Sequence, residues 1–525
     1  MLLRRESKVV GLVGLAGLAV MTTAATLTLL PAAQSGPATA GSGRAETKAP
    51  SAGSSPPEWQ VPGRQGGHAA DGGTVDRPNV LLITADDAAV GDMAYLPQTR
   101  RLIAEEGTTF DDAIAPTPIC APSRASLLTG QYAHNHGVLT VEGAGGGVQA
   151  FHDQNTLPVW LQRAGYDTLF LGKYLNGYGD DGDPVVPPGW DEWRATVGSS
   201  TYDYLNPTLT IDGHLSPRHE YTTDLIADQS SMLLNSEARK RSPWFMWVNY
   251  LAPHHGEPDD ADDQELLAEG VLTPYVAPRY RGTMEHVPLP DTPDMFRGNA
   301  PGTHWAGTSL TARQRAAVRS GFRQRLESLQ SVDDAVARTI ATLRRNHQLD
   351  DTIVIFASDN GFMTGQHNIY GKLLHYDESL RIPVTMRGPG IPKGEVVETA
   401  ITTPDLATTI AAIAGARPGR PQDGIDIRPL IQTGPWLRPI PIEAYPVLGG
   451  TSPLYTGIRY GQYTYIRMPR GAEELFDRGT DPFELTNAAG RPAYARTLAT
   501  LRAWDRRFHD CAGDTCPKAL APGVA

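Results

Sequence analysis

Two stretches of the sequence place acidic and amide side chains directly after short apolar runs. Asp86 and Asp87 follow the run PNVLLITA, and Asp359 and Asn360 follow DTIVIFAS. Adjacent carboxylates do not both ionise at close range without a compensating cation. Oxygen-only ligands favour a hard cation, calcium or magnesium, over zinc. A single acidic pair is commonly a solvated turn or helix cap, but its recurrence after two apolar runs favours a cation site.

Besides these carboxylates and amides, cysteine is a residue type that can carry chemistry, and the chain has three cysteines. Cys511 and Cys516 lie close together in the tail and are placed to pair in an oxidising compartment. Cys120 is then left alone, either as a buried side chain or as a reactive one. It opens the stretch CAPSRASLLTG (120–130), in which Pro122 suits the start of a helix.

Buried strands alternating with helices must position these residues. Three apolar runs are predicted to be strands: residues 78–87, 351–359 and 244–251. Apolar residues recur at helical spacing over residues 311–345. This alternation predicts an α/β fold with a mostly parallel sheet and helices on both faces. The carboxyl ends of such strands form one edge, where sites are usually found. Residues 455–468 are short, aromatic and β-prone, which predicts a smaller antiparallel-sheet subdomain near the C-terminus.

Bulk properties suit a soluble enzyme of 525 residues with a net charge of -12, which argues against a nucleic-acid partner. Arg4, Arg5 and Lys8 precede an apolar run that ends near residue 33, which is typical of a secretory signal; an uncleaved anchor is the alternative. We therefore expect a secreted or extracytoplasmic protein without stable membrane association after cleavage. The expected divisions are a signal peptide (1–33), a disordered linker (34–76), a catalytic domain (77–435), a C-terminal subdomain (436–510) and a tail (511–525).

The stretch that begins at Cys120 resembles the sulfatase signature C-x-P-x-R followed by T-G. The resemblance extends over roughly residues 77–490 and implies the alkaline-phosphatase-like version of the α/β fold. It also implies that a formylglycine-generating enzyme oxidises Cys120 to formylglycine. That enzyme would recognise Pro122 and Arg124. A hydrated aldehyde carries two hydroxyls: one attacks sulfur, and the other allows sulfate to leave when the aldehyde re-forms.

The same resemblance assigns the cation and its ligands. Calcium, or magnesium, would be held by Asp86, Asp87, Asp359 and Asn360 together with the modified residue 120. The cation would lower the pKa of the attacking hydroxyl and hold a sulfate oxygen. Arg124 would stabilise the developing charge on that hydroxyl.

Three further positions match residues that contact sulfate in sulfatases, and the resemblance makes them catalytic as well as substrate-binding. Lys173 lies in GKYLN, His254 in APHH and Lys372 in GQHNIYGKLLHYDES. His254 would also protonate the leaving oxygen, although His255 beside it competes for the assignment. Arylsulfatases usually carry histidine where this chain has Leu175, and Asn176 is the candidate replacement. His367 and His375 are nearby polar residues without an assigned role.

The form GKYLNGYG, with HNHGV (134–138) and PPGWDEW (187–193), resembles N-acetylglucosamine-6-sulfatases and extracellular heparan 6-O-endosulfatases. The implied substrate is a 6-O-sulfated glucosamine or a related sulfated glycan, with aryl sulfates as further candidates. His136, with His134 and Asn135, is expected to shape the substrate pocket. Two alternatives stay open: a phosphate or phosphonate ester hydrolase on the same fold, and a non-catalytic glycan-binding protein.

Overall fold

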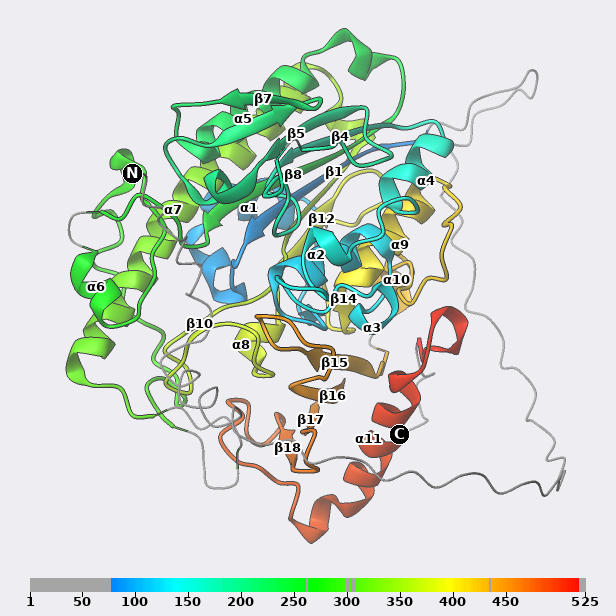
Figure 1. Ribbon diagram of the computed structural model, residues 1–525. Helices are drawn as coiled ribbons and strands as arrows, with labels where there is room; N and C mark the ends of the chain where they lie inside the picture. Colours follow the sequence, from blue (N-terminus) through cyan, green and yellow to red (C-terminus); the bar gives the residue numbers. More distant parts are fainter. Residues whose placement is uncertain are drawn as a thin grey trace, which may run out of the picture.

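A ten-stranded sheet forms the centre of the molecule in the computed structural model (Figure 1). The structure describes residues 77–182, 184–260, 263–298, 303, 308–433 and 436–518. The expected signal peptide (1–33) and linker (34–76) lie outside these residues. The strands follow the order β13-β2-β12-β9-β1-β8-β4-β5-β6-β7 across the sheet.

The five middle strands run parallel, and most of the strands beside them pair antiparallel. The middle strands are β9 (Thr352–Ser358), β1 (Asn79–Asp86), β8 (Trp244–Pro253), β4 (Asp167–Gly172) and β5 (Glu192–Thr196). The outer strands are β13 (Glu395–Val397), β2 (Thr108–Phe110), β12 (Val384–Arg387), β6 (Thr208–Ile211) and β7 (His214–Pro217). Two short pairs lie apart from this sheet: β10 (Met363–Thr364) with β11 (Tyr370–Gly371), and β3 (Ala113–Ile114) with β14 (Ile401–Thr402).

Helices cover both faces of the sheet (Figure 1). One face carries α2 (Cys120–Thr129), α4 (Leu157–Arg163) and α9 (Thr403–Ile413). The other carries α5 (Thr222–Leu234) and α7 (Ala312–Arg345). The shorter helices are α1 (Pro97–Thr99), α3 (Ala133–His136), α6 (Gln264–Ala268), α8 (Asp377–Leu380) and α10 (Leu430–Thr433).

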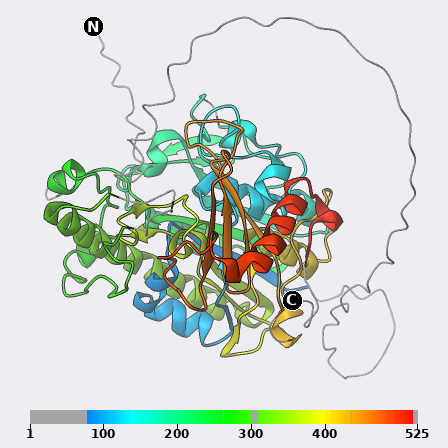
Figure 2. The same ribbon diagram turned by 90° about the horizontal axis from the view of Figure 1, so that it is seen from below.

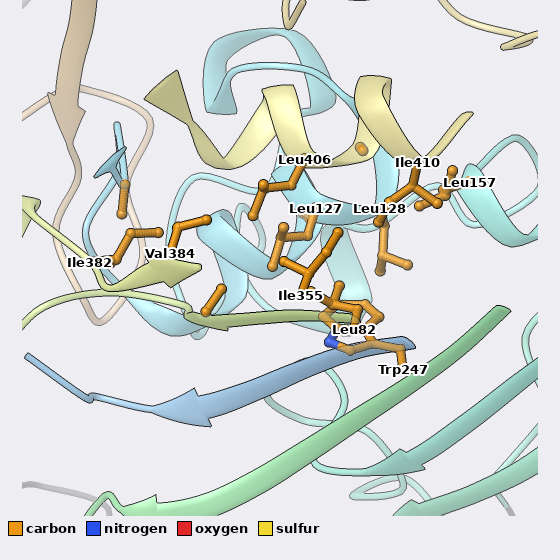
Figure 3. Close-up of a cluster of buried hydrophobic side chains, with 14 of the residues drawn as sticks. Leu82, Leu127, Leu128, Leu157, Trp247, Ile355, Ile382, Val384, Leu406 and Ile410 are labelled. Atoms are coloured by element: carbon orange, nitrogen blue, oxygen red, sulfur yellow. The ribbon is translucent and has the colours of Figure 1, made fainter. Parts of the chain in front are cut away.

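Successive residues of the middle strands point to opposite faces and build two cores. Along β1, Leu82 packs toward α2 and α9, whereas Leu81 and Ile83 pack toward α5 and α7. Figure 3 shows the first core, where Leu82 and Ile355 of the sheet lie below helical leucines and isoleucines. The strands are therefore apolar on both faces, which is why their sequences read as unbroken hydrophobic runs.

A four-stranded antiparallel sheet follows in the C-terminal part and confirms the predicted subdomain. Its strands are β15 (Ile440–Ala444), β16 (Tyr455–Tyr460), β17 (Tyr463–Arg467) and β18 (Glu473–Asp477). Helix α11 (Ala495–His509) packs against this sheet, as Figure 2 shows with the red helix beside the orange strands. The exact boundary at residues 435 and 436 stays a prediction.

The predicted elements agree with the observed ones. The runs at 78–87, 351–359 and 244–251 are β1, β9 and β8, and the helix predicted at 311–345 is α7. Thr311 caps α7, because its hydroxyl accepts the Gln314 N–H at 3.2 Å. Cys511 and Cys516 form the expected disulfide. Within the described ranges, every helix is too short or too polar to cross a membrane.

Candidate active site

Four parallel strands end at one edge of the sheet and deliver the predicted residues there. Asp86 ends β1, Asp359 follows β9, Lys173 follows β4 and His254 follows β8. Cys120 is the first residue of α2, which packs on the same sheet. The sheet register thus brings together residues that lie more than 200 positions apart in the chain.

The carboxylates of Asp86, Asp87 and Asp359 each place an oxygen within 4.8 Å of the other two, and all three residues are buried. Asn360 donates its amide N–H to Asp87 Oδ1 at 2.7 Å. Its own amide oxygen is buried without a hydrogen-bond partner among the described residues. Three carboxylates and one orphaned amide oxygen fit a hard divalent cation.

Three cationic side chains interleave with these carboxylates. Arg124 Nε donates to Asp359 Oδ2 at 2.8 Å, while Lys173 binds Asp86 and Lys372 binds Asp87. Burial opposes ionisation of Asp86, but Lys173 and the other positive charges dominate and hold the pKa of Asp86 well below its usual range. The acidic net charge of the chain therefore coexists with a local concentration of positive charge.

Cys120 lies at the centre of this arrangement. Its Sγ is 3.5 Å from Asp86 Oδ1, 2.9 Å from Lys372 Nζ and 3.7 Å from Lys173 Nζ. Burial, aided by Asp86, raises the pKa of the Cys120 thiol to about 12. The unmodified side chain is thus a protonated thiol at neutral pH and a poor nucleophile.

His254 lies beside the carboxylates of Asp86 and Asp87. Its Nε2 is 4.0 Å from Asp87 Oδ2, and one of its ring atoms falls within 4.8 Å of Asp86 and Cys120 atoms. Its Nδ1 donates to the His255 carbonyl at 2.7 Å, since a carbonyl can only accept. Burial lowers the pKa of His254 well below its usual value, so the ring is neutral and Nε2 carries a lone pair.

The two other predicted substrate-binding residues, Asn176 and His136, have hydrogen-bond partners other than the residues of this group. Asn176 donates to the Tyr202 hydroxyl at 3.0 Å, so it reaches the cluster through that tyrosine. His136 is buried on α3, where its ring contacts Ser126 Oγ at 3.1 Å and accepts the Val138 N–H at 3.1 Å. Neither of these His136 partners belongs to the group around Cys120.

The neighbours predicted with His136 also have other partners. His134 Nδ1 lies 2.9 Å from Glu443 Oε1 of β15, and Asn135 donates to Asp423 at 2.8 Å and to the Cys511 carbonyl at 2.9 Å. His134 and Asn135 therefore connect α3 to the C-terminal sheet and to the disulfide-bonded tail. His375 lies 3.1 Å from Glu474 of β18 and is likewise part of that junction.

Three residues of the site were not predicted from the sequence. Tyr202 lies under Lys173, whose Nζ is 4.9 Å from the ring centroid, and its ring is 5.2 Å from that of His254. Asn249 accepts from Arg124 at 3.1 Å; as the lone amide in the apolar run WFMWVNYL it was a readable signal. Arg325 of α7 donates to the Asp87 carbonyl at 2.6 Å, and nothing in its helical pattern marked it.

Comparison with protein-family models gives two matches. Residues 78–416 match the model described as "Sulfatase". Residues 365–507 match "N-sulphoglucosamine sulphohydrolase, C-terminal". The first match spans every residue of the group around Cys120, and the second spans the antiparallel sheet and most of α11.

Curated relatives and solved structures agree with these models. The chain is 35% identical over 378 residues to a goat (Capra hircus) N-acetylglucosamine-6-sulfatase, covering 68% of this chain and 64% of that protein. It is 34% identical over 369 residues to the Drosophila melanogaster extracellular sulfatase SULF-1 homolog, covering 68% of this chain and 31% of that one. The chain thus spans less than two thirds of either relative.

Among solved structures, a protein in complex with its substrate D-glucosamine-2-N,6-O-disulfate superposes with a TM-score of 0.68. The match covers 82% of this chain and 97% of the other at 23% sequence identity. At that identity the likeness establishes the fold, which is the expected α/β arrangement with a smaller antiparallel sheet.

Proposed function

The chain belongs to the sulfatase family, and from that premise we propose that it hydrolyses sulfate monoesters through a formylglycine made from Cys120. One observation carries this proposal. The Cys120 Sγ, which stands where a hydroxyl oxygen on the same Cβ would be, contacts both Asp86 of the carboxylate group and Lys372. An oxygen nucleophile at this position would adjoin the cation ligands and the sulfate-binding lysines at once.

Two groups complete the chemistry when they are present. The hydrated formylglycine supplies one hydroxyl for attack on sulfur and a second for sulfate release. The divalent cation supplies Lewis acidity, with calcium or magnesium held by Asp86, Asp87, Asp359 and Asn360. The chain's contribution is to fix these ligands: Arg124 donates to Asp359 through Nε and to the Lys173 carbonyl through Nη1, each at 2.8 Å, which leaves the side chain little rotational freedom.

The lysines and His254 act on the substrate. Lys173 and Lys372 flank the Cys120 Sγ, so both ammonium groups can bind the oxygens of a sulfate placed there. His254 Nε2 is an acceptor in the neutral ring. Binding of the sulfate anion favours the protonated ring, which then donates its proton to the leaving alcohol oxygen.

The relatives' names support a proposal for the substrate class. N-acetylglucosamine-6-sulfatase and the substrate complex with a glucosamine disulfate support a 6-O-sulfated glucosamine unit. We place Asn176 and Tyr202 beside Lys173, and we keep His136 as a residue that shapes the substrate pocket. The disulfide between Cys511 and Cys516 supports secretion to an oxidising compartment.

Peptide mass spectrometry across residue 120, combined with turnover, tests the proposal. We expect replacement of the thiol by an aldehyde and its hydrate in active protein. Active protein with an intact, alkylatable Cys120 would overturn the mechanism. Rates with 4-nitrophenyl sulfate and 4-nitrophenyl phosphate separate the sulfatase from the phosphate or phosphonate ester hydrolase, which predicts faster phosphate turnover.

A second comparison tests the position of the sulfate. N-acetylglucosamine 6-sulfate and glucosamine N-sulfate share the glucosamine ring. The first carries its sulfate as an ester on the 6-oxygen, and the second carries it as a sulfamate on the amino nitrogen. We expect at least about tenfold faster sulfate release from the 6-sulfate, a difference of about 1.4 kcal/mol in transition-state binding. Faster release from the N-sulfate would transfer the proposal to the activity named for the C-terminal family model.

A further inference from the structure

A second group of candidate metal ligands lies outside the site around Cys120. Asp294, His367 and Glu378 each offer one ligand atom, and these three atoms lie within 4.8 Å of one another. Asp294 belongs to the loop that precedes α7, His367 to the connection between β10 and β11, and Glu378 to the first turn of α8. The mechanism proposed above uses none of the three.

The carboxylate of Asp294 has no partner that would explain its burial. Asp294 is 0% exposed, and neither of its side-chain oxygens has a hydrogen-bond partner in the parts of the chain that the structure describes. A buried ionised carboxylate without a partner is strongly unfavourable. Glu378 places a second carboxylate oxygen within 4.8 Å of one on Asp294, so the two groups repel each other when both are ionised. A cation between the two would remove both penalties.

We propose that Asp294, His367 and Glu378 form a second divalent-cation site, selective for zinc-like ions. Two carboxylate oxygens and an imidazole nitrogen are a mixed donor set that suits zinc, unlike the all-oxygen set around Asp86. His367 is buried beside the two carboxylates, and its imidazole would bind the metal in the neutral form. Zinc–ligand distances of about 2.0–2.2 Å would draw the three atoms slightly closer together.

The backbone around the site is already held in place. His367 N–H donates to the Asp294 carbonyl at 3.0 Å, and Phe296 N–H donates to the Gly365 carbonyl at 2.9 Å. A single antiparallel bridge joins Met295 to Gln366. Glu378, Met295, Phe296 and Gln366 also line a cavity of about 1170 Å³, through which an ion can enter.

The position of this site gives it a structural consequence. His367 and Glu378 stand on either side of Lys372 in the sequence, so a shared cation would tie together both ends of the segment that carries this lysine. Asp294 would join that segment to the loop before α7. The second cation would therefore stabilise the surroundings of a sulfate-binding lysine without touching the substrate.

Zinc binding by calcium-saturated, full-length protein tests the proposal. Asp294→Asn is nearly isosteric and removes only the charge. We expect the wild-type protein to take up one Zn²⁺ per chain by elemental analysis, with a rise in Tm of about 2–5 °C at saturating zinc. Asp294→Asn should take up none at this site and show no rise. In chelator its Tm should equal or exceed that of wild type, because an unpaired buried charge has been removed.

Two further variants make the test specific. Asp291→Asn removes an exposed carboxylate from the same loop and should leave zinc uptake unchanged. Cys120→Ala removes the thiol that, with Asp86 and His254, forms another candidate group. Any of three results would overturn the proposal: wild type takes up no zinc, Asp294→Asn still takes it up, or Cys120→Ala fails to take it up. None of these readouts requires sulfatase turnover, so they are independent of the proposed activity.

Discussion

At the scale of single residues, the group around Cys120 is close to electrically balanced. Asp86, Asp87 and Asp359 face Arg124, Lys173 and Lys372, so three negative charges meet three positive ones. A divalent cation would give the site an excess of positive charge, which an incoming sulfate monoester can neutralise. We infer that cation binding and substrate binding reinforce each other.

Cys120→Ser tests whether the side chain at this position must be an aldehyde. A host that oxidises only cysteine would leave serine as a single hydroxyl, which can accept a sulfuryl group but offers no internal route for its release. We expect turnover to fall by a factor of about 10⁴ or more. Circular dichroism should show an unchanged fold. Wild-type rates in this variant would mean that formylglycine is not required.

The two histidines of α3 should respond to pH with opposite signs. Burial opposes protonation of His134, but Glu443 outweighs it and raises the pKa of His134 from 6.5 to about 9. Its stabilisation is then complete below pH 6.5 and lost as the pH rises through 9. Burial lowers the pKa of His136 to about 3, so its contribution is present above pH 6.5 and is lost as the pH falls toward 3.

Thermal melts of His134→Gln and His136→Gln measure these contributions. We expect the Tm deficit of His134→Gln to be larger at pH 6 than at pH 10. The deficit of His136→Gln should instead be larger at pH 8 than at pH 5. Parallel pH profiles for the two variants would contradict the assigned charge states.

At the scale of elements, the end of β4 depends on one glycine. Gly172 has φ +92°, and a Cβ there would lie 1.9 Å from the Asn249 carbonyl oxygen of the neighbouring β8. The next residue is Lys173, so the close approach of two parallel strands sets the position of this ammonium group. A side chain at 172 would force the strands apart where they deliver Lys173 and Asn249.

Gly172→Ala should therefore destabilise the protein more than the same substitution at another glycine with positive φ. Gly177 is the matched control, because its φ is +81° and a Cβ there meets no atom closer than 3.7 Å. We expect Gly177→Ala to lower the free energy of unfolding by about 1 kcal/mol. Gly172→Ala should lower it by at least twice as much and reduce turnover. Equal effects in denaturant titrations would show that the strand contact is not limiting.

At the scale of the whole molecule, one arginine connects the C-terminal sheet to the main sheet domain. Arg459 of β16 is 1% exposed, donates to Asp112 at 2.8 Å and also bonds Asp377 of α8. Removing the buried guanidinium takes away charge-assisted hydrogen bonds, while Arg381 and Arg478 remain near Asp377, so Arg459→Met should lower the free energy of unfolding by about 2 kcal/mol.

Arg467→Met provides the comparison within the same sheet. Arg467 bonds Asp505 of α11 at 2.6 Å, but it is 41% exposed and its pair lies within the subdomain. We expect a loss below about 1 kcal/mol. Calorimetry should also show an earlier, separate transition of the C-terminal sheet in Arg459→Met only. A single unshifted transition would mean that other contacts hold the sheet in place.

The sequence by itself determined much of this protein. Apolar runs at β1, β8 and β9 could be read directly, because strands buried on both faces carry no alternation and end abruptly in polar residues. The same ends predicted Asp86, Asp87, Asp359 and Asn360 as a ligand set, and the structure brings these side chains together. Cys120 and Arg124 were identified by a signature whose spacing is local.

Only the tertiary structure decided the remaining features. His136 stays a predicted pocket residue, and only the structure shows that its ring contacts Ser126 and accepts the Val138 N–H. Tyr202 and Arg325 reach the site from distant elements, and no local pattern encodes such a contact. The proximity of His367 to Asp294 and Glu378 was equally hidden from the sequence. Sequence patterns record the local backbone and burial, whereas a site built from strand ends depends on sheet order and register.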